Sequence, residues 1–238
     1  MRVDILGVKI DDIDINEALT QVEEWICPDG SFHRGSSTNE IRREKHYVVT
    51  PNPEFLVAAQ KDPIFKKILN DADLSVPDGA GLKLSGKIKN TFSGTDFMER
   101  LIEVAAEKGF VVGFLGGKDG VAEKVAECLK RKYPALKVLL TSADTKSLIP
   151  PLDLLFVALG HVKQEKWIAD NLDKIPVHLA MGVGGAFDYL SGEVRRAPKW
   201  MRDLGFEWLF RLILQPWRIK RQMALGQYIL YLLAEYVS

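Results

Sequence analysis

Cysteine and long apolar runs are both scarce in this chain of 238 residues. The two cysteines, Cys27 and Cys128, have neither metal-site nor disulfide-framework spacing, which favours a reducing, cytoplasmic setting. No apolar run reaches the roughly 20 residues that span a bilayer, and the nearest, 228–237, is broken by Glu235. The N-terminus turns polar at Asp4, too early for a signal peptide. We therefore expect a cytoplasmic protein without a membrane span.

Net charge is also absent, because 32 basic residues balance 32 acidic ones. This balance argues against a nucleic-acid partner, which would require a basic surface. Residues 195–221 nevertheless hold eight basic and two acidic residues, interleaved with three tryptophans. Tryptophan prefers the membrane interface, and each basic residue near an anionic surface adds about 1 kcal/mol of attraction. We expect residues 192–238 to form a helical appendage on the inner face of the cell membrane. The alternative is an amphipathic helix packed on its own domain or on a second copy.

Apolar strand patterns alternate with amphipathic helix patterns over most of the chain before that segment. This alternation predicts a domain, residues 1–191, with a Rossmann-like α/β fold, in which a parallel sheet has helices on both faces. Residues 28–45 are polar and are expected to be a loop or insertion. The expected strands are a hairpin at 3–10 and the segments 46–50, 74–76, 110–115, 137–140, 152–159 and 177–181. The expected helices begin near 16, 53, 63, 95, 120 and 163.

Four turns at the carboxyl ends of these strands carry groups suited to a ligand. They are Thr50-Pro51-Asn52, Pro77-Asp78-Gly79, Gly116-Gly117 and the loop Gly182–Gly185. Ligands of open parallel sheets bind beyond the carboxyl ends of the strands. Glycine there allows backbone N–H groups to approach a pyrophosphate. Each turn alone is consistent with an ordinary tight connection, whereas the four together indicate one shared site.

Two side chains that follow predicted strands have chemistry suited to group transfer. Asp78 follows an apolar strand and can accept a proton from an attacking hydroxyl, which is worth on the order of 10²–10⁴-fold in rate. Gln164, between Lys163 and Glu165 at a helix start, can hydrogen-bond a sugar or phosphate. The alternatives are a turn-forming Asp-Gly pair and a solvated first helical turn.

Metal-binding patterns are missing from the sequence. The four histidines lack ligand spacing, and no Asp-x-Asp pair is suited to hold a divalent ion on a nucleotide. We therefore expect neither a metal nor a cofactor. Arginine, lysine and backbone dipoles would then have to meet the charge of a bound phosphate.

Taken as a set, the motifs resemble the WecG/TagA/CpsF glycosyltransferase family (glycosyltransferase family 26), from Val3 to about Arg221. The resemblance rests on the four turns above, on Ser93-Gly94-Thr95-Asp96 and on the run from Gly160 to Arg221. It implies transfer of a sugar from a UDP-sugar donor to a polyprenol-diphosphate-linked acceptor, with inversion and without a metal. The type reaction of the family moves N-acetylmannosamine onto undecaprenyl-diphosphate-GlcNAc for wall teichoic acid. Relatives build other surface polysaccharides.

The resemblance also implies roles for particular residues. Asp78 would be the general base, and Thr50 and Gln164 would be polar residues of the active site. Arg211, Arg218 and Arg221 would reach back from the appendage to the diphosphate. The remaining residues expected to contact substrate are Asn52, Gly116, Gly117, Lys163, Glu165, Gly182, Gly184, Gly185 and Asp188.

The chain departs from the family pattern at three places. Val162 replaces a proline, Thr91 stands near the position of a usual arginine, and residues 141–151 are shorter than expected. These differences leave open a non-catalytic, membrane-associated protein that binds nucleotide-sugars. A dinucleotide enzyme, suggested by Gly116-Gly117-x-x-Gly120, is disfavoured because no Gly-x-Gly-x-x-Gly turn follows the first strand. A homo-oligomer is also open, because the appendage can bury its apolar face in a second copy as readily as in lipid.

Overall fold

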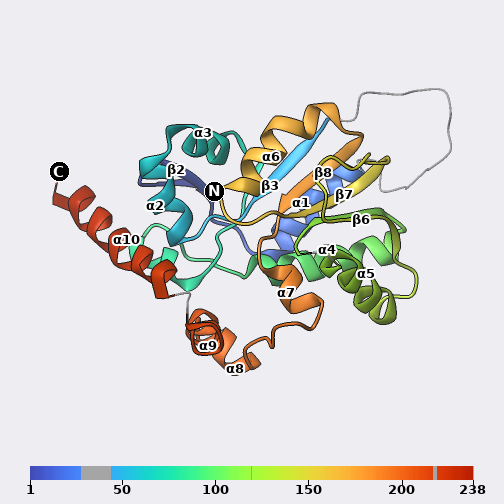
Figure 1. Cartoon of the computed structure of the whole chain (residues 1–238). Coiled ribbons are helices and arrows are strands. Elements are labelled where there is room, and N and C mark those ends of the chain that lie inside the picture. The colour runs from blue at the N-terminus through green and yellow to red at the C-terminus, as the bar shows by residue number, and fades with distance from the viewer. Residues whose placement is uncertain (28–43, 119, 217–218, 238) are drawn as a thin grey trace.

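The computed structural model describes the backbone of residues 1–27, 44–118, 120–216 and 219–237. The side chains of residues 203, 220–222 and 237 also lie outside the described set, as does most of the predicted 28–45 loop. Six parallel strands form the central sheet in the order β4-β3-β8-β7-β5-β6 (Figure 1). The strands are β3 His46–Val49, β4 Leu74–Ser75, β5 Val111–Gly116, β6 Lys137–Ser142, β7 Leu152–Ala158 and β8 Val177–Gly182.

A short antiparallel hairpin precedes the sheet, as the sequence predicts. Its strands are β1 (Arg2–Ile5) and β2 (Val8–Asp11). Leu6 and Gly7 turn the chain with φ values of 55° and 76°, a left-handed geometry that glycine adopts without strain. Helix α1 (Ile15–Ile26) follows, and Asp14 and Glu17 form a capping box at its start.

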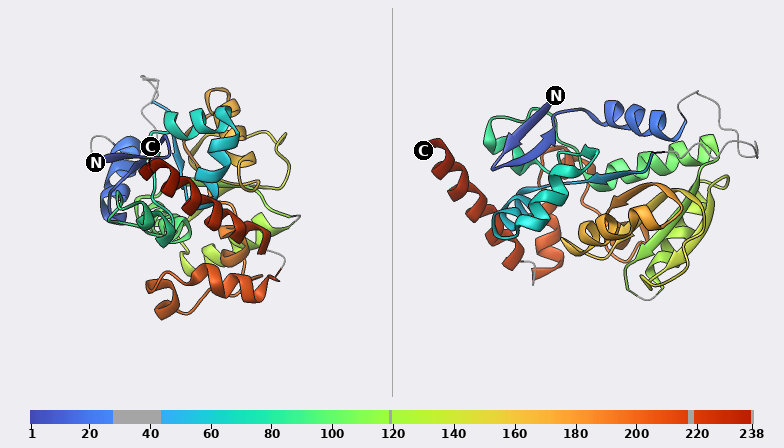
Figure 2. Two further views of the ribbon diagram at one scale, coloured as in Figure 1. Left: turned by 90° about the vertical axis from the view of Figure 1, so that its left-hand side faces the viewer. Right: turned by 90° about the horizontal axis from the view of Figure 1, so that it is seen from above.

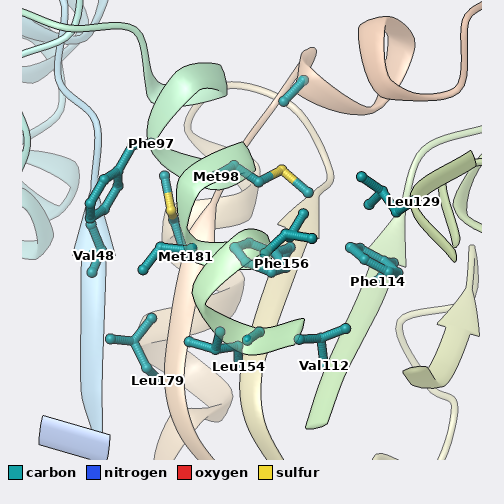
Figure 3. Packing of buried hydrophobic residues seen from close by; sticks show 14 of the residues in the cluster. Val48, Phe97, Met98, Val112, Phe114, Leu129, Leu154, Phe156, Leu179 and Met181 are labelled. Carbon is teal, nitrogen blue, oxygen red and sulfur yellow. The ribbon is translucent and has the colours of Figure 1, made fainter. Parts of the chain in front are cut away.

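Helices cover both faces of the sheet, which confirms the predicted fold class. One face packs against α1, α4 (Gly94–Lys108), α5 (Val121–Lys132) and α7 (Ala186–Leu190). Figure 3 shows this layer, in which Phe97 and Met98 of α4 lie over strand residues such as Met181. The other face packs against α2 (Pro53–Lys61), α3 (Pro63–Asp71) and α6 (Lys163–Asn171), which is followed by a 3-10 turn at Leu172–Lys174. Strand side chains alternate between the two layers, so both faces are apolar.

Three helices complete the chain: α8 (Lys199–Asp203), α9 (Glu207–Leu214) and α10 (Ile219–Val237). Figure 2 shows α10 along one end of the molecule, beside α2. Tyr228 of α10 is fully buried against this side, and Lys87 pairs with Glu235 at 3.1 Å. Among the described helices we find no stretch with the length and hydropathy that a bilayer span requires. The division at residue 191 into a domain and an appendage stays a prediction.

Local details differ from the sequence-based expectation near α4. Ser93, not Thr95, is the N-cap, because its hydroxyl oxygen accepts from the backbone N–H of Thr95 at 3.2 Å. Thr95 is therefore the second residue of the helix, and the predicted cap is wrong. The patterns also do not predict the 3-10 helix η1 (Ala80–Ser85) or the five-residue α7, both too short to show a period.

Candidate active site

A cleft of about 760 Å³ lies beyond the carboxyl ends of β3 and β4. Its walls come from the turns after these strands, from η1, from the start of α4 and from α8, α9 and α10. Asn52, Asp78 and Arg211 line it, so three of the predicted site residues meet in one cavity. The crevice position agrees with the general rule for open parallel sheets.

The turns after β3 and β4 meet the start of α4. The carboxylate of Asp78 accepts from the backbone N–H of Gly94 at 3.4 Å. Thr50 is 7% exposed and packs directly on Gly94, since a Cβ there would lie 3.1 Å from Thr50 Cγ2. Asn52 caps α2, its side-chain oxygen accepting from the backbone N–H groups of Glu54 and Phe55. Asp78 is thus held at the N-terminus of α4. Because Gly94 has no side chain, this end of α4 packs directly against Thr50.

Burial raises the pKa of Asp78 to about 7, and the nearby carboxylates of Glu207 and Asp96 raise it as well. The Gly94 N–H and the positive charge of Arg196 act in the opposite direction. A carboxyl group that titrates near neutral pH has the proton affinity of an effective general base. The cleft therefore contains a group fitted to remove a proton from a bound hydroxyl.

Gln164 and Glu165 support the glycine loop after β8. The side-chain oxygen of Gln164 accepts from Gly184 N at 2.9 Å, and its amide nitrogen donates to Glu165 at 2.6 Å. A Cβ on Gly182 would lie 2.7 Å from the Glu165 carboxylate, so a larger residue there would displace the Gln164 and Glu165 side chains. Glu165 is completely buried, which raises its pKa to about 7. Gln164 and Glu165 thus hold the glycine loop in place. Contact of these two side chains with substrate stays a prediction.

Arg211 links the glycine loop to the C-terminal helices. Its guanidinium donates to Asp188 at 2.7 Å and lies 4.5 Å from the ring centroid of Tyr189. A Cβ on Gly185 would come within 2.6 Å of Arg211 Nη1, so the absence of a side chain leaves room for the guanidinium. Asp188 and Gly185 therefore position a cation that faces the cleft from α9.

The structure places the other predicted residues elsewhere. Gly116 and Gly117 end β5, where Gly117 N donates to Ala158 O at 2.8 Å, and neither residue lines the cleft. Lys163 is exposed at the start of α6, also outside the cleft wall. Arg218 lies outside the described residues, as does the side chain of Arg221. Within the described part of the chain, no group of three or more His, Cys, Asp or Glu side chains is arranged to hold a metal ion.

Five charged residues of the cleft wall were not among the predicted site residues: Glu54, Lys83, Asp96, Arg202 and Glu207. Thr91 also lines the cleft, whereas Lys87 pairs with Glu235 outside it. Lys83 makes no ion pair with the residues described here, and it lies on η1, which begins directly after the Asp78-Gly79 turn. The one sequence signal that favoured Lys83 as a site residue is its closeness to Asp78.

Comparison with known proteins agrees with this geometry. The model of the glycosyl transferase WecG/TagA/CpsF family matches residues 3–238. The chain belongs to this family. A Bacillus subtilis (strain 168) relative is 34% identical over 214 residues, which cover 81% of this chain and 84% of the relative. A Staphylococcus aureus (strain MRSA252) relative is 29% identical over 234 residues, 92% of this chain and 87% of the relative.

Both relatives are named N-acetylglucosaminyldiphosphoundecaprenol N-acetyl-beta-D-mannosaminyltransferase. The resemblance drawn from the motifs is thereby confirmed, and this member of the WecG/TagA/CpsF family is a glycosyltransferase. Its cleft combines a carboxyl group of raised pKa with cations from η1, α8 and α9. That combination suits the removal of a hydroxyl proton beside a phosphate-bearing leaving group.

Proposed function

We propose that this glycosyltransferase moves N-acetylmannosamine, or a related sugar, from a UDP-sugar to undecaprenyl-diphosphate-GlcNAc. The product would enter the synthesis of teichoic acid or another surface polysaccharide. The observation that carries the proposal is Asp78, which lines a 760 Å³ cleft together with Lys83 and Arg211. The names of the relatives support both the sugar and the acceptor.

The chemistry is a single displacement at the anomeric carbon of the donor sugar. Asp78 takes the proton of the acceptor hydroxyl while that oxygen forms its bond to the anomeric carbon. The bond between this carbon and the UDP oxygen breaks, and UDP departs with the electron pair. Because the acceptor attacks opposite the leaving group, the configuration inverts. Positive groups fixed in the cleft stabilise the charge that develops on UDP.

Lys83, Arg202 and Arg211 line the cleft and can meet that charge. Asp96 holds the guanidinium of Arg202 at 3.1 Å and Asp188 holds that of Arg211 at 2.7 Å, whereas Lys83 makes no ion pair with the residues described here. Each of the two arginines keeps its Nε buried and without a hydrogen-bond partner among the residues described here. A guanidinium and an ammonium can replace a divalent ion as phosphate partners. We therefore propose that the reaction needs no metal.

A direct assay tests this proposal. UDP-N-acetylmannosamine and a short-chain lipid-diphosphate-GlcNAc acceptor are incubated with the protein and excess EDTA, and products are weighed by mass spectrometry. We expect a product heavier by one N-acetylhexosamine, formed equally fast with and without EDTA. Loss of product with EDTA would contradict metal independence. No product from any of a panel of UDP-sugars, with UDP still bound, would favour the non-catalytic alternative.

Membrane association is the second part of the proposal. Large apolar side chains stand exposed along the segment from α8 to α10, and two of them, Leu204 and Trp208, also line the cleft. The exposed side chains are Trp200, Leu204, Phe206, Trp208, Ile213, Leu214, Ile219, Met223, Ile229, Leu230, Leu233 and Tyr236. Such a surface, with the local excess of basic residues, suits peripheral attachment to the inner face of the membrane. A lipid-linked acceptor would then reach the cleft without leaving the bilayer.

Vesicle flotation tests the attachment. Ile213→Glu and Leu230→Glu are expected to reduce co-flotation with anionic phospholipid vesicles at least tenfold, because each places a charge in the apolar surface. Leu148→Glu is the matched control, since Leu148 is 93% exposed before β7, away from these helices. Unchanged flotation of the two variants, with a change in oligomeric state, would assign this surface to a second copy instead.

A further inference from the structure

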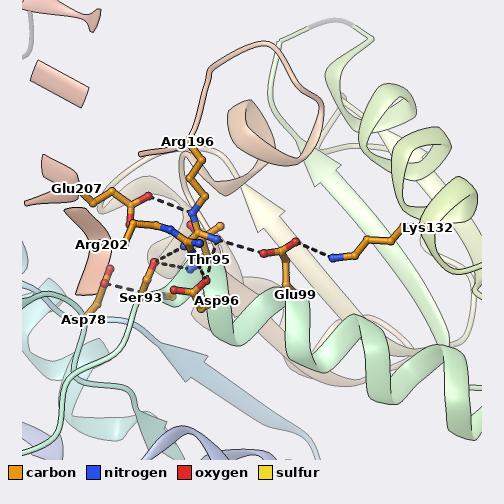
Figure 4. A network of polar contacts seen from close by, with 10 residues as sticks. Asp78, Ser93, Thr95, Asp96, Glu99, Lys132, Arg196, Arg202 and Glu207 are labelled. Carbon is orange, nitrogen blue, oxygen red and sulfur yellow. Dashed lines mark hydrogen bonds and ion pairs between the residues drawn. The ribbon is translucent and has the colours of Figure 1, made fainter. Parts of the chain in front are cut away.

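Arg196 is the centre of a cluster of ion pairs beside the cleft (Figure 4). Its guanidinium lies 2.7 Å from Asp96 and 3.1 Å from Glu99, both on α4. Its Nε lies 3.2 Å from the carboxylate of Glu207, the first residue of α9. The side chain is only 18% exposed. Arg196 therefore joins α4, which packs on the sheet, to the helix that carries Arg211.

The same cluster faces the proposed base. Asp96 and Glu207 line the cleft that contains Asp78, and Asp96 lies two residues after Gly94, which donates to Asp78. The other charged groups of the cleft wall are Glu54 on α2, Lys83 on η1, Arg202 on α8 and Arg211 on α9. Arg202 and Arg211 are each held by one carboxylate, whereas Arg196 contacts three. Arg196 is thus the main counter-charge of the acidic groups around Asp78.

We propose that Arg196 is a positioning residue for sugar transfer: it balances the charge of Asp96 and Glu207 beside Asp78 and holds α9 against α4. The proposal rests on the proposed function, in which Asp78 is the base. Without Arg196, two carboxylates would face Asp78 with less neutralisation, and α9 would lose its attachment to α4. Removal of one partner from a partly buried ion cluster also leaves the others in an unfavourable environment.

Variants that remove the positive or the negative charge are expected to move the pH profile of kcat/KM in opposite directions. Asp78 is active when deprotonated, so the acidic limb of kcat/KM follows its pKa in the free enzyme. Arg196→Gln removes a positive charge and is expected to move that limb to higher pH by about 0.5–1 unit. Glu207→Gln removes a negative charge and is expected to move it to lower pH by a similar amount. The double variant is expected to return the limb to near the wild-type position.

The Arg196→Lys variant distinguishes the effect of the positive charge from the effect of the guanidinium's contacts. Lysine keeps the positive charge but cannot contact three carboxylates with a planar fork. We expect the pH limb to stay in place while kcat/KM falls about tenfold, because α9 is held less firmly. If Arg196→Gln alone is too unstable to purify, comparison of the double variant with Glu207→Gln still measures the charge effect of Arg196.

A carboxyl titration distinguishes failure of this inference from failure of the proposed function. With ¹³C-labelled aspartate, the Asp78 signal reports its pKa without substrate, assigned by its loss in Asp78→Asn. Displacements of opposite sign in Arg196→Gln and Glu207→Gln support the charge role, whatever the reaction is. An unmoved titration and an unmoved pH limb in both variants would overturn it. An unmoved limb together with a displaced titration would instead remove Asp78 as the base and so reject the proposed function.

Discussion

Asp78→Asn is expected to lower kcat for sugar transfer by about 10²–10⁴-fold while UDP binding is retained. Asparagine has the shape of aspartate, and its side-chain oxygen can still accept from the N–H of Gly94, as the carboxylate does at 3.4 Å. The variant therefore removes the proton acceptor with little change to the cleft. Asp71→Asn, on the exposed surface of α3, is the control and should leave turnover unchanged. Near-normal turnover in Asp78→Asn would exclude Asp78 as the base.

The same substitution should make the fold more stable. The folded protein raises the pKa of Asp78 from 3.8 to about 7, so folding disfavours the charged form. This carboxyl group lowers stability progressively as pH rises from about 4 to about 7, and the loss is complete above that range. Asparagine stays neutral, and we expect it to raise the free energy of unfolding at pH 8 by roughly 1–3 kcal/mol. Urea denaturation at pH 8 and pH 4 measures this; an equal effect at both would contradict it.

Local patterns were sufficient to predict the strands of the sheet and a few residues of the cleft. Buried parallel strands appear as short apolar runs between amphipathic helices, and proline marks the starts of α2 at Pro53 and α3 at Pro63. The carboxyl ends of parallel strands share one edge, so Asn52 and Asp78 could be expected to meet. This inference uses only local sequence and the general geometry of such sheets.

Strand order is not contained in those patterns, and it decides which turns share a site. β5 is separated from β3 by β8 and β7, so Gly116 and Gly117 lie away from the cleft although they end a strand of the same sheet. Charged residues such as Arg196 and Glu207 look like ordinary surface positions in the sequence. Only the packing of the C-terminal helices brings them beside Asp78.

Gly185→Ala is expected to reduce transfer by displacing Arg211 rather than by disturbing the fold. The φ of Gly185 is −79°, which alanine adopts without strain. The new Cβ would lie 2.6 Å from Arg211 Nη1, and that guanidinium is the end of a flexible side chain. Arg211 would move away from the loop and from Asp188. We expect kcat/KM to fall about tenfold or more, with the melting temperature nearly unchanged.

Arg211→Gln is expected to have the larger effect, about 10²-fold in kcat, because it removes a cation that stabilises the departing UDP. The combination of the two variants is the decisive measurement. If Gly185 acts only by leaving room for Arg211, the double variant should be no slower than Arg211→Gln alone. Multiplied effects would mean that the glycine loop contributes to transfer independently of Arg211. Gly226→Ala on α10, where a Cβ meets no atom within 4 Å, is the control and should leave kcat/KM unchanged.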